Sequence, residues 1–382
     1  HDNSAIRLAA ANGHVDVVQY LCELPAGRGV HPGAGNNYAI RGAADNGHVD
    51  VVRYLCELPG DRGVDPGAVD NDAIRLAAAN GHADVVRYLC ELPGDRGVNP
   101  GADANYAIRL AAANGHVDVV QCLCELPAGR GMHPGAGNNY AIRGAADNGH
   151  VDVVRYLCEL PVDRGVHPGA DDNDAIRCAA ANGHVDVVRY LCELPGDRGV
   201  HPGAHHNYAI RCAAANGHTD VVRYLCELPG DRGVHPGADD NFAIRLAAQH
   251  GHVDVVRYLC ELPGDRGVYP DARSNYTIRW AAANGHVDVV RYLCELPGDR
   301  GVHPDADDNF AIRWATHRGH VDVVRYLCEL PGDRGVHPGA DDNFAIRLAA
   351  AHGDVDVVRY LCELPYQGEY PDADNNFAIR QA

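Results

Sequence analysis

The sequence has no lysine, and serine occurs only at Ser4 and Ser274 of its 382 residues. All 33 basic residues are arginines, and 52 acidic residues bring the net charge to -19. Without lysine there is no Gly-x-x-x-x-Gly-Lys phosphate loop, and neither serine lies in a nucleophile elbow. An acidic surface also lacks the basic stripe that displaces counterions from phosphates. The composition therefore argues against phosphate chemistry, a serine nucleophile and a nucleic-acid partner.

Long apolar runs are missing as well. No stretch approaches the roughly 20 apolar residues that cross a bilayer, and no signal-like apolar run opens the sequence. We therefore expect no membrane insertion. Aromatic residues make up only 6% of the chain, so its apolar content rests on Ala, Val, Leu and Ile, which suits thin helical layers better than a deep core.

Cysteine is abundant, with fourteen copies, but its placement follows a repeat. Eleven copies occupy one repeat position: Cys22, Cys56, Cys90, Cys124, Cys158, Cys192, Cys226, Cys260, Cys294, Cys328 and Cys362. Equivalent residues of stacked helices lie about 8–10 Å apart, whereas a disulfide needs Cα atoms within about 7 Å. We expect small buried hydrophobes at these positions. Cys122, Cys178 and Cys212 lie outside the series and are the candidates for reactivity. Many unpaired thiols and the missing signal run favour an intracellular protein.

A 34-residue unit recurs along the chain. Its Ala-Ile-Arg triplet starts at Ala5, Ala39, Ala73, Ala107, Ala141, Ala175, Ala209, Ala243, Thr277, Ala311 and Ala345, and a partial unit occupies 378–382. A fixed period of this length indicates one supersecondary unit stacked many times, with each copy covering the apolar face of its neighbour. The sequence therefore predicts an all-α solenoid of about eleven repeats that forms a single domain over 1–382.

The unit from 37 to 70 shows how one repeat folds. Asn37 is a strong N-cap residue, so a first helix should begin there. Ile40, Ala43 and Ala44 then give one apolar stripe whose small alanines permit close helix approach. Gly47 should end this helix in the left-handed conformation.

A second helix should run from about 49 to 58, with Val51 and Leu55 on its buried face. Pro59 ends it, because the residue before a proline is pushed out of the helical region. The residues from 60 to 70 are mostly turn formers and predict a protruding loop. Each repeat is therefore helix, turn, helix and loop, with the loops aligned along one edge.

The string Ala-Ala-x-x-Gly-His-x-x-Val-Val-x-x-Leu, seen at 43–55, resembles the ankyrin repeat and recurs with small changes in all eleven units. The resemblance implies a right-handed, gently curved solenoid, non-enzymatic, that binds proteins through its concave face and loop tips. The sequence departs from the family's usual Thr-Pro-Leu-His opening, because residues 38–41 read Tyr-Ala-Ile-Arg. We expect Asn37 to take over the capping role and Arg41 to approach loop carbonyls or the acids around Asp70.

Histidines are numerous but regular. Ten follow the repeat's glycine: His14, His48, His82, His116, His150, His184, His218, His252, His286 and His320. We expect each to bond backbone groups of the adjacent turn, because spacing near 10 Å cannot bring two of them to one metal. His201, His205 and His206 form the one local cluster with arguable ligand spacing, and no cysteine or carboxylate completes it. The sequence predicts no metal site, no cofactor and no enzymatic activity.

Variation between repeats is concentrated at the fourth position of the first helix, where Trp280 and Trp314 stand one repeat apart. Tryptophan is enriched at binding hot spots, so these two residues, with Tyr276, Phe310 and Arg273, outline a candidate protein-binding site. The alternative is that large side chains fill gaps between helix layers.

A second function stays open. Residues 26–45 reappear with small changes at 128–147, three repeats later, and this uniformity also suits a structural protein that self-assembles end to end or laterally into a filament. The chain begins and ends inside a repeat, which suggests a fragment or processed product and predicts end contacts. The candidate residues are Ile6, Leu8, Phe377 and Ile379.

Overall fold

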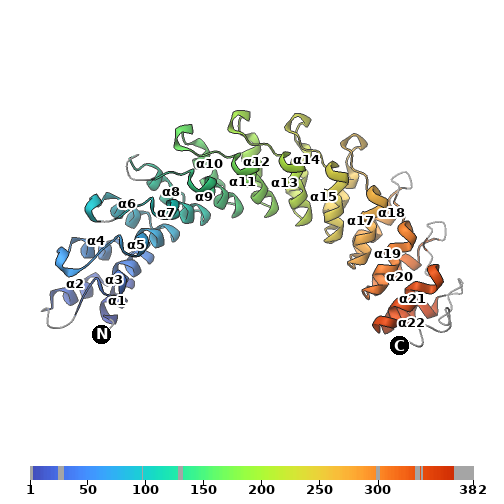
Figure 1. Ribbon diagram of the computed structural model, residues 1–382, viewed down its shortest axis with the longest axis horizontal. Helices are drawn as coiled ribbons and strands as arrows, with labels where there is room; N and C mark the ends of the chain where they lie inside the picture. Colours follow the sequence, from blue (N-terminus) through green and yellow to red (C-terminus); the bar gives the residue numbers. More distant parts are fainter. Residues whose placement is uncertain are drawn as a thin grey trace. The chain divides into compact units, whose positions relative to one another are not determined.

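The structure is a computed structural model that describes residues 3–24, 30–96, 98–127, 132–297, 302–331, 336 and 339–364, apart from the side chains of 61, 95, 231, 265 and 340–342. The chain divides into two compact units: the first comprises His1–Ala179 and Asp186–His201, and the second Ala180–Val185 and Pro202–Ala382. Each unit is built from the same stacked helical repeat (Figure 1). That 1–382 forms a single domain stays a prediction.

Every regular element in the described residues is helical, which confirms the predicted all-α repeat. The first helices of the repeats are α1 (Ser4–Ala11), α3 (Ala34–Asp45), α5 (Ala68–Ala79), α7 (Ala102–Ala113), α9 (Ala136–Asp147), α11 (Ala170–Ala181), α13 (Ala204–Ala215), α15 (Ala238–Gln249), α17 (Ala272–Ala283), α19 (Ala306–His317) and α21 (Ala340–His352). The second helices are α2 (Val15–Glu23), α4 (Val49–Glu57), α6 (Ala83–Glu91), α8 (Val117–Cys124), α10 (Val151–Glu159), α12 (Val185–Glu193), α14 (Thr219–Glu227), α16 (Val253–Glu261), α18 (Val287–Glu295), α20 (Val321–Cys328) and α22 (Val355–Glu363).

Two helical layers carry the core of each unit. Within each unit odd-numbered helices pack on one another, as α3 on α5 and α15 on α17, and so do even-numbered helices, as α4 on α6 and α16 on α18. Ile40, Ala43, Ala44, Val52 and Leu55 are at most 1% exposed, and their equivalents recur through the array. Removing apolar surface from water at every interface is the main stabilising term, and identical residues supply it in repeat after repeat.

The start of each first helix differs from the prediction. Asn37 does not cap the helix: Gly35, Asn36 and Asn37 form a left-handed turn before the regular helical residues. Asparagine tolerates positive φ better than most residues. The Asn37 side chain is buried, and its Oδ1 accepts a hydrogen bond from the Asp65 amide at 2.7 Å, 28 residues later. The asparagine therefore fixes the end of the loop against the start of the first helix.

The ends of both helices agree with the prediction. Gly47 has φ 76, the left-handed conformation expected after the first helix. The second helix α4 ends at Glu57, and Leu58 before Pro59 is extended, with ψ 144.

Short 3₁₀ turns occupy the loops that follow several second helices: η2 (Gly60–Arg62), η3 (Gly94–Arg96), η5 (Val162–Arg164), η6 (Gly196–Arg198), η7 (Gly230–Arg232) and η8 (Gly264–Arg266). In η2 the Arg62 guanidinium donates to the Cys22 carbonyl in the last turn of α2, and Arg164 does the same to Cys124. A cation at a helix C-terminus compensates the helix dipole. The arginines therefore tie each of these loops to the preceding repeat.

The repeated histidines join neighbouring repeats. His116 Nε2 lies 2.9 Å from the Ala79 carbonyl at the end of α5, and because a carbonyl only accepts, Nε2 carries the proton. The same ring packs on Gly81, where an added Cβ would lie 2.6 Å from Nδ1. The predicted backbone bonding is therefore confirmed, and the Gly-His pairing has a steric reason: the glycine of one repeat makes room for the histidine of the next.

Candidate protein-binding face

In several first helices an arginine stacks on an aromatic ring of the following repeat. Arg7 lies 3.9 Å from the Tyr38 ring centroid, and Arg109 lies 4.2 Å from that of Tyr140. Such cation–π contacts are strongest where the groups are shielded from water. The face of the first helices is thus lined by alternating guanidinium groups and rings.

Where an aspartate replaces the ring, the arginine forms an ion pair. Arg41 Nη2 is 2.5 Å from Asp72 Oδ2, and Arg143 Nε is 2.5 Å from Asp174 Oδ2. The expectation that Arg41 approaches the acids near Asp70 is confirmed, with Asp72 as the partner. Because these side chains are partly exposed, each pair adds little stability, and its main role is to hold the arginine in place.

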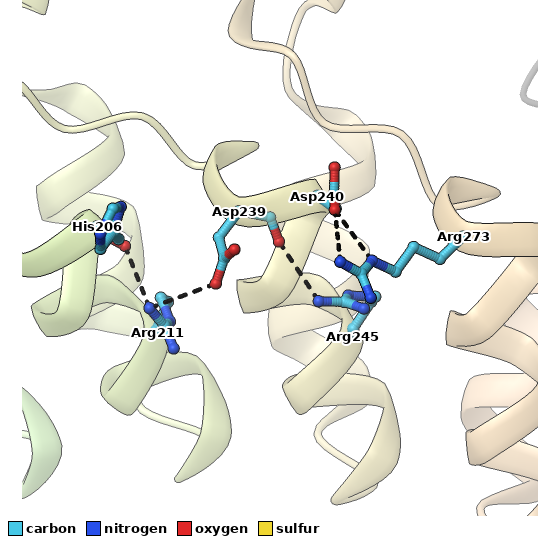
Figure 2. A network of polar contacts seen from close by, with 6 residues as sticks. All are labelled: His206, Arg211, Asp239, Asp240, Arg245 and Arg273. Atoms are coloured by element: carbon cyan, nitrogen blue, oxygen red, sulfur yellow. Dashed lines mark hydrogen bonds and ion pairs between the residues drawn. The ribbon is translucent and has the colours of Figure 1, made fainter.

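The second unit contains a local polar network at the starts of its first helices (Figure 2). Arg211 approaches the His206 carbonyl at 3.5 Å and the Asp239 carboxylate at 3.6 Å. Arg245, 5% exposed, donates to the Asp239 carbonyl at 3.4 Å. Burial, followed by the nearby Arg273 charge, lowers the pKa of Arg245.

Arg273 extends from the start of α17 to Asp240 (Figure 2). Its Nε and Nη2 donate to the same Asp240 oxygen at 3.0 and 2.8 Å. Within the described residues the structure gives Arg273 no ring contact. This arginine therefore lies in a charge pair beside the predicted site and does not join its aromatic residues.

The other four predicted site residues come together. The ring centroids are separated by 5.6 Å between Tyr276 and Trp280, 6.0 Å between Trp280 and Phe310, and 5.5 Å between Phe310 and Trp314. Offset and tilted rings at these distances attract one another beyond their area burial. Both tryptophans of the chain thus belong to one run of rings on α17 and α19.

Two histidines that the sequence did not single out continue this run. Trp314 meets His317 edge-on at 5.0 Å, and His317 meets His352 at 4.3 Å. We call the six residues Tyr276, Trp280, Phe310, Trp314, His317 and His352 the ring ladder. A signal was present, because most other repeats have alanine at the position of His317 and asparagine at that of His352. Their contact depends on stacking across 35 residues, which a position-by-position comparison does not show.

The ladder borders an open hollow. The hollow has a volume of about 210 Å³ and is lined by Arg313, Trp314, His317, Phe344 and Leu348. Trp314 is 37% exposed, and the buried Nδ1 of His317 has no hydrogen-bond partner among the described residues. An apolar recess with one unsatisfied polar atom and a cation on its wall fits an apolar group that carries a polar or anionic neighbour.

Arg318 adds a second cation to the ladder, again at a position where most repeats have asparagine. Its Nη1 donates to Asn284 Oδ1 at 2.6 Å and to the Ala283 carbonyl at 3.2 Å. Its guanidinium lies 5.7 Å from the Trp314 ring. The ring ladder is therefore flanked by positive charge on a chain whose net charge is -19.

The repeat pattern of this architecture identifies its family. A family model described as ankyrin repeats (3 copies) matches residues 42–133, 74–172, 108–202, 197–274 and 278–376. The chain belongs to the ankyrin-repeat family. Ankyrin repeats generally mediate protein–protein interaction and are typically non-catalytic.

The chain also matches solved structures. An ankyrin repeat family protein from Legionella pneumophila is 21% identical, with 82% of this chain and 85% of that chain covered and a TM-score of 0.31. No curated protein matches the sequence. Among the residues the structure describes, no helix has the length and apolarity to cross a membrane.

Other candidate chemistry on this ankyrin array has little structural support. His201, His205 and His206 are exposed, and no group of three or more His, Cys, Asp or Glu side chains is arranged to hold a metal in the described part of the chain. Burial raises the pKa of Cys178 to about 11 and also raises that of Cys122. A raised pKa leaves less of the nucleophilic thiolate. The raised pKa values count against reactivity of these two thiols, and the reactivity of Cys122, Cys178 and Cys212 stays a prediction.

Proposed function

We propose that this ankyrin array is a non-enzymatic scaffold that binds a protein partner through the ring ladder and the hollow beside it. The observation that carries the proposal is the continuous contact of six rings on a half-exposed face, with Trp314 37% exposed. Clustered tryptophan with flanking arginine is the composition typical of binding hot spots.

The alternative, that large side chains only fill gaps, is less consistent with the geometry. Core positions beneath the ladder are already closed by Ala281, Ala282 and Ala315, all 0% exposed. The equivalent positions of other repeats carry Gly42 or Gly144 at the place of Trp280, and the layers pack there as well. Because the packing does not require these rings, we infer that they serve recognition.

The test begins with a displayed library of random peptides selected on the immobilised full chain. Calorimetry of one selected peptide then compares wild type with Trp280→Ala and Trp314→Ala. The matched controls are Leu110→Ala and Leu76→Ala, which truncate the same repeat position in the first unit. We expect each tryptophan variant to lose at least about 2 kcal/mol of binding free energy, as hot-spot residues do, which corresponds to about thirtyfold weaker binding. Equal affinities in all five proteins would refute the proposal.

Self-assembly into a filament remains the alternative function. One observation favours it: Leu8, a predicted end-contact residue, is 64% exposed. Ile6 is only 1% exposed and is inaccessible, and Phe377 and Ile379 lie outside the described residues. Light scattering across protein concentration tests this function, with Leu8→Asp as the variant. Growth of particle mass in wild type and its loss in the variant would support it, and a constant monomer mass would exclude it.

A further inference from the structure

The second helices carry a regular contact of their own. Arg53 stacks on Tyr88 at 4.7 Å, and the Tyr88 hydroxyl donates to the Arg53 carbonyl at 3.5 Å. The same pair of contacts joins Arg155 to Tyr190, Arg223 to Tyr258, Arg257 to Tyr292, Arg291 to Tyr326 and Arg325 to Tyr360. The repeat thus has a fixed binding position for a tyrosine side chain, formed by the guanidinium and carbonyl of the arginine in the preceding repeat.

In the first unit, between α6 and α8, this position has no tyrosine. Cys122 stands where the tyrosine belongs, so no ring lies over Arg87 among the described residues. Two further residues at this place are smaller than their counterparts, since Ala83 replaces valine and Gln121 replaces arginine. Only five residues of the eleven second helices depart from the repeat, and three of them meet here.

The result is a hollow that we call the tyrosine gap, of about 500 Å³. Its lining residues include Ala83, Asp84, Arg87, Asp118, Gln121, Cys122 and Glu125. An intact repeat provides a comparison: between α16 and α18 a hollow of about 460 Å³ has Tyr292 in its wall, already stacked on Arg257. What distinguishes the two hollows is therefore the missing ring and not their size.

The charged residues around the gap indicate which residues should flank an incoming aromatic side chain. Asp84, Asp118 and Glu125 are exposed at the gap, and Arg87 is the one guanidinium in its lining. Arg87 Nη1 lies 3.5 Å from Asp84 Oδ1 and also reaches the Cys122 thiol. Three carboxylates against one guanidinium leave an excess of two negative charges. A complementary segment therefore carries basic residues beside its aromatic residue.

We propose that the tyrosine gap is a docking site for a tyrosine side chain of a partner protein, with lysine or arginine on either side of it. The incoming ring would stack on Arg87 and its hydroxyl would donate to the Arg87 carbonyl, as the chain's own tyrosines do one repeat away. The flanking cations would meet Asp84, Asp118 and Glu125. This surface lies on the second helices, so the proposal is independent of the ring ladder on the first helices.

The test uses the full chain and three peptides: acetyl-Arg-Tyr-Arg-amide, acetyl-Arg-Ala-Arg-amide and acetyl-Glu-Tyr-Glu-amide. Affinities are measured by NMR titration at low ionic strength. We expect saturable binding of the basic tyrosine peptide, and about tenfold weaker binding or none for each of the others, because the alanine peptide lacks the cation–π contact and the acidic peptide places like charges against the carboxylates.

Two variants locate the binding. Cys122→Tyr restores the residue that the other repeats have, so this variant should fold and its tyrosine should fill the gap. The affinity for the basic tyrosine peptide should then fall about tenfold or more. Cys212→Ala removes a thiol from a first helix outside the gap and should leave the affinity within about twofold of wild type. Absence of saturable binding, equal binding of the alanine peptide, or full binding to Cys122→Tyr would each overturn the proposal. None of these results would affect peptide binding at Trp280 and Trp314.

Discussion

The first helices of the two units bury similar residues and differ in the residues on their surface. In the first unit the fourth position carries glycine, leucine or cysteine, whereas in the second Trp280 and Trp314 occur beside Cys212, Leu246 and Leu348. The two residues that follow are 0% exposed after Gly42 and Gly144 in the first unit and after Trp280 and Trp314 in the second. These core residues therefore stay buried whether the fourth position is glycine or tryptophan.

This comparison separates two kinds of residue. Buried leucine, the asparagine of the left-handed turn and the Gly-His pair recur because each repeat interface needs them. The ring ladder, by contrast, occurs on three repeats and satisfies no need that the other repeats share. A residue that equivalent, equally well-packed positions lack is not needed for packing and is free to serve recognition. This is the physical reason for placing the proposed ring-ladder binding site on the second unit.

The largest expected effect comes from truncating the shared core. Leu89→Ala in the first unit and Leu293→Ala in the second each remove a side chain that is 0% exposed. We expect each variant to lose about 2–5 kcal/mol of stability, because each leaves a cavity in the same surroundings. Chemical unfolding followed by circular dichroism measures the loss. A difference of more than about 2 kcal/mol between the two would show that the interiors are not equivalent.

The next effect concerns the Gly-His pair. Gly81→Ala puts a Cβ on a residue with φ +80 and 2.6 Å from His116 Nδ1, and Gly285→Ala does the same at φ +81 and 2.7 Å from His320 Nδ1. Left-handed strain of about 1–2 kcal/mol and a disturbed hydrogen bond of about 1 kcal/mol predict a loss of about 2–3 kcal/mol in either unit.

Gly63→Ala is the matched control for these variants, because Gly63 also has positive φ, +69, but an added Cβ meets open space there. It should lose only the left-handed strain of about 1–2 kcal/mol. Equal losses for Gly63→Ala and Gly81→Ala in thermal unfolding would show that the histidine contact is not responsible.

A smaller effect on stability is expected from the ladder itself. Trp314→Leu installs the residue that Leu110 provides in the first unit and removes the ring contacts to Phe310 and His317. Aromatic pairs of this kind contribute about 0.5–1.5 kcal/mol, so the loss should stay in that range. A loss above about 3 kcal/mol by urea unfolding would instead mark Trp314 as a core residue.

The smallest effect is the pH dependence that His286 contributes in the second unit. Burial lowers the pKa of His286, and His320, His250 and His252 lower it further. The folded protein therefore binds this proton less readily than the unfolded chain, whose histidines titrate near about 6.5. The contribution of His286 to the free energy of unfolding is therefore complete above that pH and is lost as the pH falls below it. Replacing His286 with Gln should flatten thermal stability between pH 5 and 7; an unchanged slope would contradict the assignment.

Much of the fold was predictable because every local signal occurs many times. The period located both helices, and Gly47 and Pro59 marked their ends. Asn37 shows the limit: asparagine favours both helix N-caps and left-handed backbone, and only the loop amide of Asp65 decides between them. In the site, aromatic residues at repeat-related positions identified four members of the ladder, whereas His317 and His352 meet only through stacking. Sequence did not show that Arg273 pairs with Asp240 of the preceding repeat, and its part in binding stays a prediction.

The most direct test of the account uses the two tryptophans as reporters. Both belong to the ring ladder and the chain has no others, so their emission reports on this face alone. A selected peptide should shift or quench tryptophan emission with the same midpoint that calorimetry gives for its binding, and Trp314→Leu should abolish most of the signal. Tight calorimetric binding with no change in tryptophan emission would place the partner elsewhere and contradict the central claim.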